Sequence, residues 1–174
     1  MKLDRWKQFI WNLSQLAEPA PALPSGLNFR PAERSDEATL QALTARAFSF
    51  DDQWTGSYRR IAEALQMRIH EAFRVHSHPA ITIMHGPRII AASCLTSDSD
   101  ADNHLFTGPC VLPEYRSRGL GSALLFQSLI ALRKDGCHIA RAVCKDATTA
   151  AKFIYPKFGS VCETYDLEPF TVLS

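Results

Sequence analysis

The sequence lacks the features of several large protein classes. No apolar run in its 174 residues reaches the roughly 18 residues that a membrane-spanning helix needs. The five cysteines include no Cys-x-x-Cys pair, which argues against a zinc site or a disulfide framework and indicates reduced thiols in a cytoplasmic protein. A formal net charge of +1 provides no excess of positive charge for binding nucleic acid. The N-terminus, Met1–Lys7, is too charged for a secretory signal peptide.

Two common phosphate-binding motifs are missing as well. The sequence has no Gly-Lys-Ser/Thr tripeptide of a nucleoside-triphosphate loop, and Leu124 stands where the dinucleotide fingerprint needs its third glycine. Asp98, Asp100 and Asp102 alternate as in a calcium loop, but the required glycine and closing glutamate are absent. We therefore expect a solvated turn at these aspartates and no metal site.

What is present suits one folded domain with a short N-terminal appendage. Hydrophobic content of 46% and charged content of 21% are ordinary for a soluble globular protein. Apolar periodicity predicts helices over residues 36–48, from about 57 and over 119–134, the first of them capped by Ser35. Strands are predicted over residues 27–30, 80–84, 89–95, 104–112 and 138–144, with two more within 161–173. The strand–loop–helix–strand order across 104–144 predicts a parallel crossover unit.

Residues 1–25 are predicted to form an amphipathic helix and a proline-rich connector, and residues 26–174 the main domain. Trp6, Phe9, Ile10, Leu13 and Ala17 have the spacing of one helical face. The proline-rich stretch that follows would end this helix and act as a stiff connector. We expect the appendage to dock on its own domain or to pair with another subunit as a homodimer. Its few basic residues make membrane binding the weaker interpretation.

The most informative stretch is a glycine-containing loop at residues 111–123. Gly119 and Gly121 allow a sharp turn and a close approach of the backbone to a ligand. The loop opens a helix, and the first amides of a helix have no partner within it, so they form an anion site that suits phosphate. Arg116 and Arg118 add positive charge beside it.

This loop reads Arg-x-x-Gly-x-Gly behind a strand that ends in Val-x-Pro, which resembles the coenzyme A loop of the GNAT N-acetyltransferase superfamily. A second signature of that family is matched by Ala151, Tyr155 and Gly159, although Thr148 replaces its asparagine and Ser160 its phenylalanine. The resemblance covers about residues 27–173. It implies an α/β fold (α+β in some schemes) with a mixed, mostly antiparallel central sheet, a parallel strand–loop–helix–strand unit and helices on both faces.

The resemblance also implies a function, an acetyl-CoA-dependent N-acetyltransferase without a metal. A primary amine of a small molecule or peptide would attack the thioester directly. Tyr155 occupies the catalytic position beside the leaving sulfur. The strand that leads into the loop would donate an amide to the thioester oxygen. The residues implied to contact acetyl-CoA are Cys110, Val111, Leu112, Arg116, Ser117, Arg118, Gly119, Leu120, Gly121, Ser122 and Thr148.

The chemistry of Tyr155 is open in one respect. A phenol with a pKa near 10 protonating a thiolate with a pKa near 8.5 is uphill by roughly 2 kcal/mol. Stabilisation of the sulfur by a hydrogen bond is therefore the more plausible role. Pro156 disfavours helix at Tyr155, which could rotate the ring away from the sulfur or leave it a packing residue. Pro156 and the two substitutions in the second signature also favour an alternative, a sensor or interaction module that binds acyl-CoA without turnover, whereas the intact Tyr155 argues against it.

The general base and the acceptor pocket are also open. The amine must lose a proton before it attacks, because its pKa of about 10.4 keeps it charged at neutral pH. The sequence does not place the candidate bases relative to one another. Three aromatic residues near the end of the first predicted helix could wall a substrate pocket or pack in the core. The candidate bases are His85, His104, Glu33, Asp51 and Asp52, and the three aromatic residues are Phe48, Phe50 and Trp54.

Overall fold

The structure is a computed structural model, and it describes residues 5–17, 19–50 and 58–166. Its strands form a three-stranded sheet in the order β6-β1-β7 and a four-stranded sheet in the order β2-β3-β4-β5. The elements in chain order are β1 (Trp6–Asn12), η1 (Leu13–Gln15), β2 (Leu27–Pro31), η2 (Arg34–Asp36), α1 (Glu37–Ser49), α2 (Tyr58–Val75), β3 (Ala80–His85), β4 (Arg88–Cys94), β5 (Gly108–Val111), η4 (Pro113–Tyr115), α3 (Leu120–Lys134), β6 (Ile139–Lys145), η5 (Ala150–Ile154) and β7 (Val161–Tyr165).

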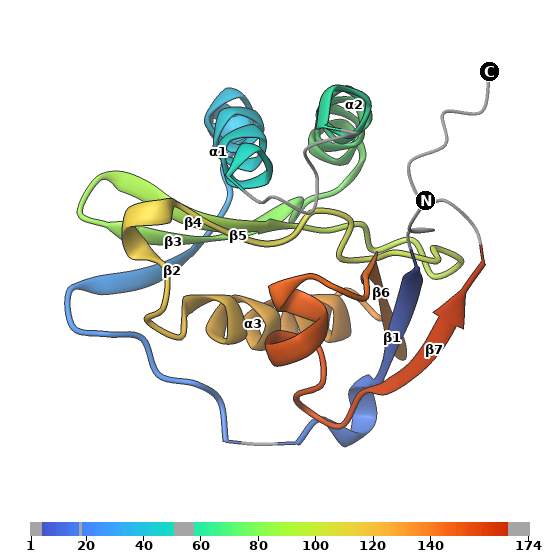
Figure 1. Ribbon diagram of the computed structural model, residues 1–174. Helices are drawn as coiled ribbons and strands as arrows, with labels where there is room; N and C mark the ends of the chain where they lie inside the picture. The colour runs from blue at the N-terminus through green and yellow to red at the C-terminus, as the bar shows by residue number, and fades with distance from the viewer. Residues whose placement is uncertain (1–4, 18, 51–57, 167–174) are drawn as a thin grey trace.

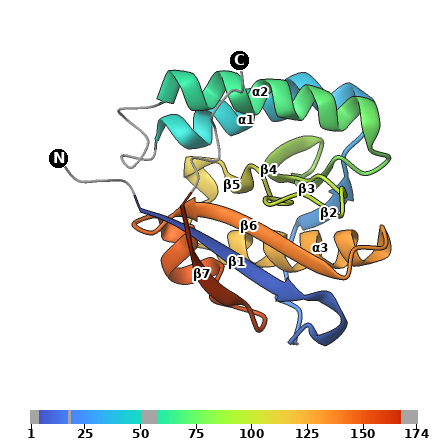
Figure 2. The same ribbon diagram turned by 90° about the vertical axis from the view of Figure 1, so that its right-hand side faces the viewer.

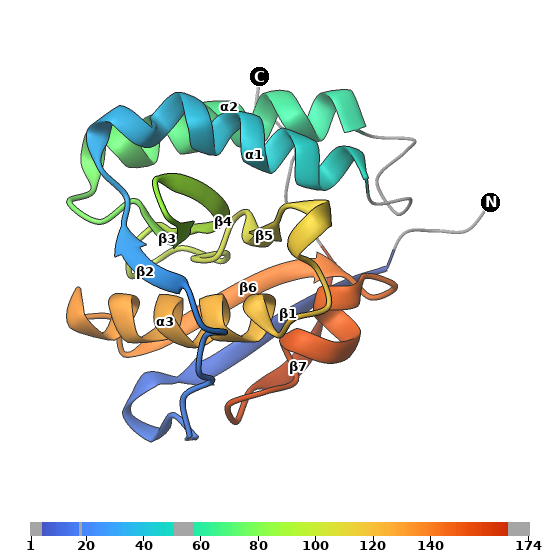
Figure 3. The same cartoon turned by 90° about the vertical axis from the view of Figure 1, so that its left-hand side faces the viewer.

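Helices cover both faces of the four-stranded sheet. The pair α1 and α2 lies on one face and α3 lies on the other (Figures 1 and 3). Helix α3 contacts β3, β4 and β5 on one side and η1, η5 and β6 on the other, so it is covered around most of its circumference. Its apolar composition predicted this burial, because a helix that is apolar all round must be packed on more than one side.

The N-terminal segment is a strand, so the predicted helix over these residues is wrong. Strand β1 lies between β6 and β7 and pairs antiparallel with both (Figure 2). Trp6, for example, is opposite Lys145 on one side and Tyr165 on the other. Trp6, Phe9 and Trp11 are buried, and aromatic residues favour strands. Trp6–Asn12 therefore belongs to the main fold, because β1 is the central strand of a sheet.

The expected strand–loop–helix–strand order is present, but its two strands do not pair with each other as a parallel unit. Strands β5 and β6 belong to different sheets, and every strand pair within the described residues is antiparallel. The two segments meet just before β5, where the amides of His104 and Leu105 both donate to the carbonyl of Arg141. Gly108 then takes a left-handed φ of 64°, and β5 begins there and not at residue 104. Beyond this point β5 and β6 separate.

The other predicted elements are confirmed, with small corrections. The helices α1, α2 and α3, the hairpin of β3 and β4, and strands β2 and β6 all form at the predicted places. Ser35 does not cap α1; instead Glu33 and Asp36 form a reciprocal capping box at η2. Of the two closing strands predicted within 161–173, β7 forms over 161–165 and the remainder lies outside the described residues. None of the helices in the described ranges is long and apolar enough to cross a membrane.

Candidate functional site

A cavity of about 500 Å³ lies where β5 and β6 separate, which is a typical volume for a small-molecule site. The end of α1, strands β5 and β6, the first turn of α3 and the segment 148–157 line it. Of the predicted contact residues, only Leu112 and Arg118 do not line this cavity. Those that do are Cys110, Val111, Arg116, Ser117, Gly119, Leu120, Gly121, Ser122, Thr148 and Tyr155.

One end of the cavity is the N-terminus of α3. Gly119 is the N-cap, with a left-handed φ of 77° that favours glycine, and it provides no side chain to cap the helix. The amides of Leu120, Gly121 and Ser122 therefore have no acceptor within the helix. The first turn also contains no acidic residue. This end of the cavity has the chemistry that suits a phosphate group, and phosphate binding here stays a prediction.

A glycine is needed at position 121 for packing as well as for the approach of a ligand. A Cβ added there would come within 2.7 Å of Cδ1 of Ile154, which also lines the cavity. The glycine lets α3 and η5 approach closely. A larger residue at position 121 would therefore disturb packing and not only the approach of a ligand.

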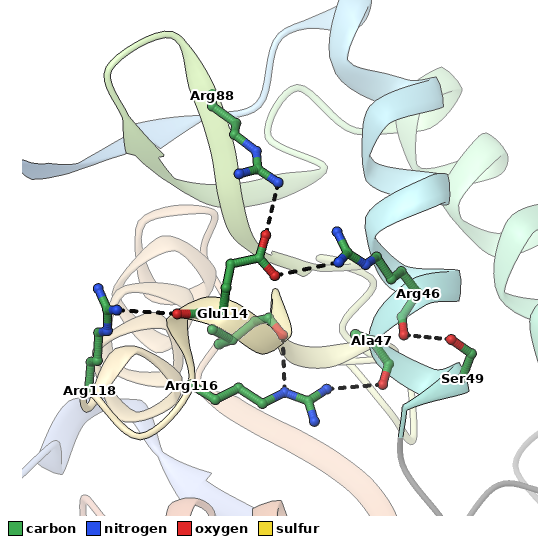
Figure 4. A network of polar contacts seen from close by, with 8 residues as sticks. Arg46, Ala47, Ser49, Arg88, Glu114, Arg116 and Arg118 are labelled. Atoms are coloured by element: carbon green, nitrogen blue, oxygen red, sulfur yellow. Dashed lines mark hydrogen bonds and ion pairs between the residues drawn. The ribbon is translucent and has the colours of Figure 1, made fainter.

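The two loop arginines are held by backbone carbonyls (Figure 4). Arg116 donates from Nε to the carbonyl of Val111 at 3.3 Å and from Nη2 to that of Ala47 at 3.2 Å, which ties the end of β5 to the end of α1. Arg118 donates to the carbonyl of Glu114 at 3.2 Å, away from the cavity. Phosphate binding by these arginines stays a prediction. The hydrogen bonds described here hold the loop in position.

Glu114 anchors the same loop to two other elements. Its carboxylate pairs with Arg88 at 3.0 Å and with Arg46 at 3.6 Å (Figure 4). The pKa of Glu114 is lowered by a hydrogen bond from its own amide and by the two arginines. Because all three side chains are exposed, these pairs position the loop more than they stabilise the fold.

Lys157 is a cavity residue that the sequence did not reveal. Its Nζ donates to Oγ of Ser122 at 2.7 Å, which brings a positive charge to the first turn of α3. Its carbonyl accepts from Nε1 of Trp11 at 2.8 Å, so β1 holds this turn in place. The contact joins residues 35 positions apart. The sequence offered one signal, a lysine two residues after the matched Tyr155. Its position alone does not indicate that its side chain reaches the first turn of α3.

Tyr155 lies at the other end of the cavity. It is only 2% exposed, and its ring packs against Phe9 and Trp11 at centroid distances of 5.4 and 5.7 Å. A Cβ added at Gly108 would come within 2.5 Å of its hydroxyl oxygen, so the hydroxyl lies at the start of β5, where the two strands part. Pro156 does not unwind this position, because the tyrosine keeps helical dihedrals and its amide donates to Ala150 in a single π-helical turn.

Burial keeps the tyrosine and the two nearby thiols protonated. It raises the pKa of Tyr155 well above its ordinary value, and the Cys144 and Cys110 thiols add to this. It also raises the pKa of Cys110 and of Cys144 to about 12. Neither thiol is therefore a thiolate at neutral pH, and this argues against a nucleophilic cysteine.

The candidate bases that the structure describes, His85, His104 and Glu33, are not among the cavity-lining residues. His85 lies on the β3–β4 hairpin, with Nδ1 2.6 Å from the Tyr115 hydroxyl. His104 is fully buried, Nδ1 accepts from the amide of Arg141, and burial lowers its pKa. Glu33 pairs with Arg30 on the surface. Asp51 and Asp52 lie outside the described residues.

The aromatic residues near the end of α1 differ in whether they line the cavity. Phe48 lines the cavity, whereas Phe50 is 59% exposed beneath Arg46. Trp54 lies outside the described residues. Oγ1 of Thr148 accepts from the amide of Ala151, in the first turn of η5, at 3.3 Å. Within the described ranges, no group of three metal-ligating side chains could hold an ion.

Comparison with known proteins agrees with this geometry. The model of the Acetyltransferase (GNAT) family matches residues 40–159, which is more than half of the chain. The chain belongs to the GNAT acetyltransferase family. A mycothiol acetyltransferase of Thermobispora bispora is 32% identical over 158 residues, which cover 86% of this chain and 51% of that protein. This GNAT chain thus spans about half the length of that relative.

Solved structures of the family share the fold. A GCN5-related N-acetyltransferase from Sphaerobacter thermophilus superposes with a TM-score of 0.63 at 17% identity, over 92% of this chain and 49% of the other. A GNAT-family acetyltransferase from Colwellia psychrerythraea gives 0.62 at 13% identity, over 93% and 54%. At such identities the likeness concerns the GNAT fold and not the acceptor.

Proposed function

We propose that the chain transfers an acetyl group from acetyl-CoA to a primary amine. The observation that carries this proposal is a single cavity that joins an uncapped helix N-terminus to a buried tyrosine hydroxyl. The first end suits the phosphates of a coenzyme A carrier, and Lys157 adds charge there. The second end suits the thioester.

Tyr155 acts on the leaving sulfur. The amine nitrogen attacks the carbonyl carbon, a C–N bond forms, the C–S bond breaks, and the sulfur leaves with the electron pair. The raised pKa of Tyr155 makes complete proton transfer to the sulfur more costly than for an ordinary phenol. The hydroxyl therefore stabilises the sulfur as a hydrogen-bond donor, and CoA takes up its proton from solvent.

The attack is direct. A two-step route would need a cysteine thiolate, and the thiols of Cys110 and Cys144 are held protonated. The carbonyl oxygen would accept from an amide of Cys110, Val111 or Leu112, as the family resemblance implies. Leu112 is the weakest of the three candidates, because its amide already donates to the carbonyl of Ile90.

A sensor that binds acyl-CoA without turnover is the second candidate. It is favoured by the lack of any carboxylate or imidazole among the described residues that line the cavity. In the enzyme, the amine would pass its proton through water or to a group beside the cavity.

Tyr155→Phe separates the two functions. The hydroxyl acts mainly in the transition state, so kcat should fall by roughly ten- to a thousandfold while the Kd for acetyl-CoA changes by less than about threefold. Calorimetry gives the Kd, and release of free CoA with a panel of amines gives kcat. Binding without CoA release by the wild-type chain would establish the sensor, and wild-type turnover by the variant would remove Tyr155 from the mechanism.

A further inference from the structure

Phe106 separates the candidate site from a second cavity. Its side chain lines the cavity of about 500 Å³ described above and also one of about 400 Å³ beside α2. A hydrogen bond completes the wall, since the amide of Val143, in the first cavity, donates at 3.1 Å to Oδ1 of Asn103, in the second. Phe106 is only 5% exposed, so it closes one end of the candidate site and does not form its opening.

The backbone fixes Phe106 in this position. The amide of Gly108 donates to the carbonyl of Leu105 at 2.9 Å, which places Phe106 and Thr107 at the two central positions of a tight turn. Oγ1 of Thr107 accepts from the amide of Cys94, at the end of β4, at 3.0 Å. The amide of Leu105 donates to a carbonyl of β6 at 3.3 Å. The turn is therefore tied to a strand of each sheet, and it cannot shift to widen the cavity without breaking these hydrogen bonds.

The ring of Phe106 lies where the acyl group of the thioester would be. The Tyr155 hydroxyl, which is proposed to act on the leaving sulfur, lies against Gly108, since a Cβ added there would come within 2.5 Å of the hydroxyl oxygen. Phe106 belongs to the same turn as Gly108. A CoA carrier with its phosphates at the N-terminus of α3 and its sulfur beside Tyr155 therefore has its acyl group at the end of the cavity that Phe106 closes.

The acceptor does not reach the site past this wall. An amine enters from solvent, and Phe106 and Val143 are both buried, so this end of the cavity is closed to it. The acyl group enters already attached to its carrier and needs no opening here. Phe106 therefore faces the acyl group and not the amine.

We propose that Phe106 restricts the transferred group to a short acyl chain, so that acetyl is used in preference to butyryl or longer chains. A longer straight chain would extend into the space that the ring fills. In Phe106→Ala this space becomes continuous with the second cavity, and longer chains gain room. The inference rests on the proposed acyl transfer, but its effect on acyl-CoA binding can be measured without an acceptor.

The test compares acetyl-CoA with butyryl-CoA, whose acyl chain is longer by two methylene groups. Wild type, Phe106→Leu and Phe106→Ala are assayed for CoA release with the panel of amines, and by calorimetry without an amine. Truncation of a buried aromatic can unfold a domain, so circular dichroism checks folding, and the milder Phe106→Leu carries the test if Phe106→Ala does not fold. The control is Phe73→Leu, because Phe73 is also buried but lines neither of the two cavities.

In wild type, kcat/KM for butyryl-CoA should be roughly a hundredfold or more below that for acetyl-CoA, since a pocket discriminates by about tenfold or more for each methylene. The ratio of butyryl to acetyl should rise about tenfold in Phe106→Leu and up to about a hundredfold in Phe106→Ala, and it should not change in Phe73→Leu. Without an amine, the Kd for butyryl-CoA in Phe106→Ala should fall below that for acetyl-CoA by on the order of tenfold, because the two added methylenes are then buried.

Two results would overturn the inference: a wild-type chain that transfers butyryl as readily as acetyl, or folded Phe106 variants in which neither the kcat/KM ratio nor the Kd ratio moves toward butyryl. Either result leaves the proposed function intact as long as acetyl is transferred. A wild-type chain that releases no CoA from either acyl-CoA with any amine would refute the transfer. The Kd ratio alone would then decide whether Phe106 restricts the acyl chain.

Discussion

Replacing Trp11 by alanine should show whether the N-terminal strand is part of the fold. The side chain is fully buried near the C-terminal end of β1, and truncation of a buried aromatic costs about 3–5 kcal/mol. The change also removes the donor to the carbonyl of Lys157, and an unsatisfied carbonyl costs about 1–3 kcal/mol if it stays buried. The edge-to-face contact with Tyr155 is lost as well. We expect a total loss of about 4–8 kcal/mol, which is comparable to the whole stability of a marginal domain.

The measurement is the free energy of unfolding from urea titrations followed by circular dichroism. Trp11→Phe keeps most of the apolar volume and loses the hydrogen bond, so it should cost about 2 kcal/mol and remain folded in buffer. Ile10→Ala, at a half-buried position of the same strand, serves as the control and should cost about 1 kcal/mol. If Trp11→Ala loses less than about 1 kcal/mol, β1 is a detachable segment and the reasoning from burial fails.

Three further predictions concern charge and protonation. Lys157→Met should weaken acetyl-CoA binding by roughly ten- to a hundredfold, since a charged hydrogen bond to phosphate contributes about 1.5–3 kcal/mol. Lys152→Met, at an exposed position outside the cavity, should leave the Kd unchanged in the same calorimetry. Iodoacetamide at pH 8 should modify the exposed Cys162 first and spare Cys110 and Cys144; rapid labelling of all three, read by mass spectrometry, would contradict their burial. Folding raises the pKa of these two buried thiols from about 9 to about 12, so above pH 9 the native state binds more protons than the unfolded state. The free energy of unfolding should therefore be greatest below pH 9 and lower by about 3 kcal/mol at pH 10. Urea midpoints that do not fall between pH 8 and 10 would contradict this.

The local parts of the site could be predicted from the sequence. The turn at Gly119 and the helix after it depend on a few neighbouring residues, so their pattern indicates both the backbone and the free amides. The hydrogen bond from the amide of Ala151 to Thr148 is equally local, although it was not predicted from the sequence. Such features can be predicted because the residues that interact are neighbours in the sequence.

The N-terminal strand could not be predicted in this way. Trp6, Phe9, Ile10 and Leu13 fit the spacing of a helical face, and the same stretch is rich in residues that favour strands. What decides between them is the backbone hydrogen bonding with β6 and β7, more than 120 residues away. Tertiary context overrides local pattern here.

The contact between Lys157 and Ser122 depends on context in the same manner. The residue after Lys157 is Phe158, which has a left-handed φ of 62°, a strained conformation for a bulky residue. Packing of its ring against Phe126, at a centroid distance of 5.1 Å, accompanies that strain. No pattern within the second signature indicates this turn.

The position of β1 between β6 and β7 has a consequence for synthesis in the cell. On the ribosome β1 is made first, but its neighbours are complete only when residue 165 has been added. At roughly 5–20 residues per second, the strand waits about 8 to 30 seconds for them. During that time Trp6, Phe9 and Trp11 are exposed on an unpaired strand, the kind of segment on which aggregation begins. The three-stranded sheet therefore forms late, after the residues of α1, α2, α3 and the four-stranded sheet have all been made.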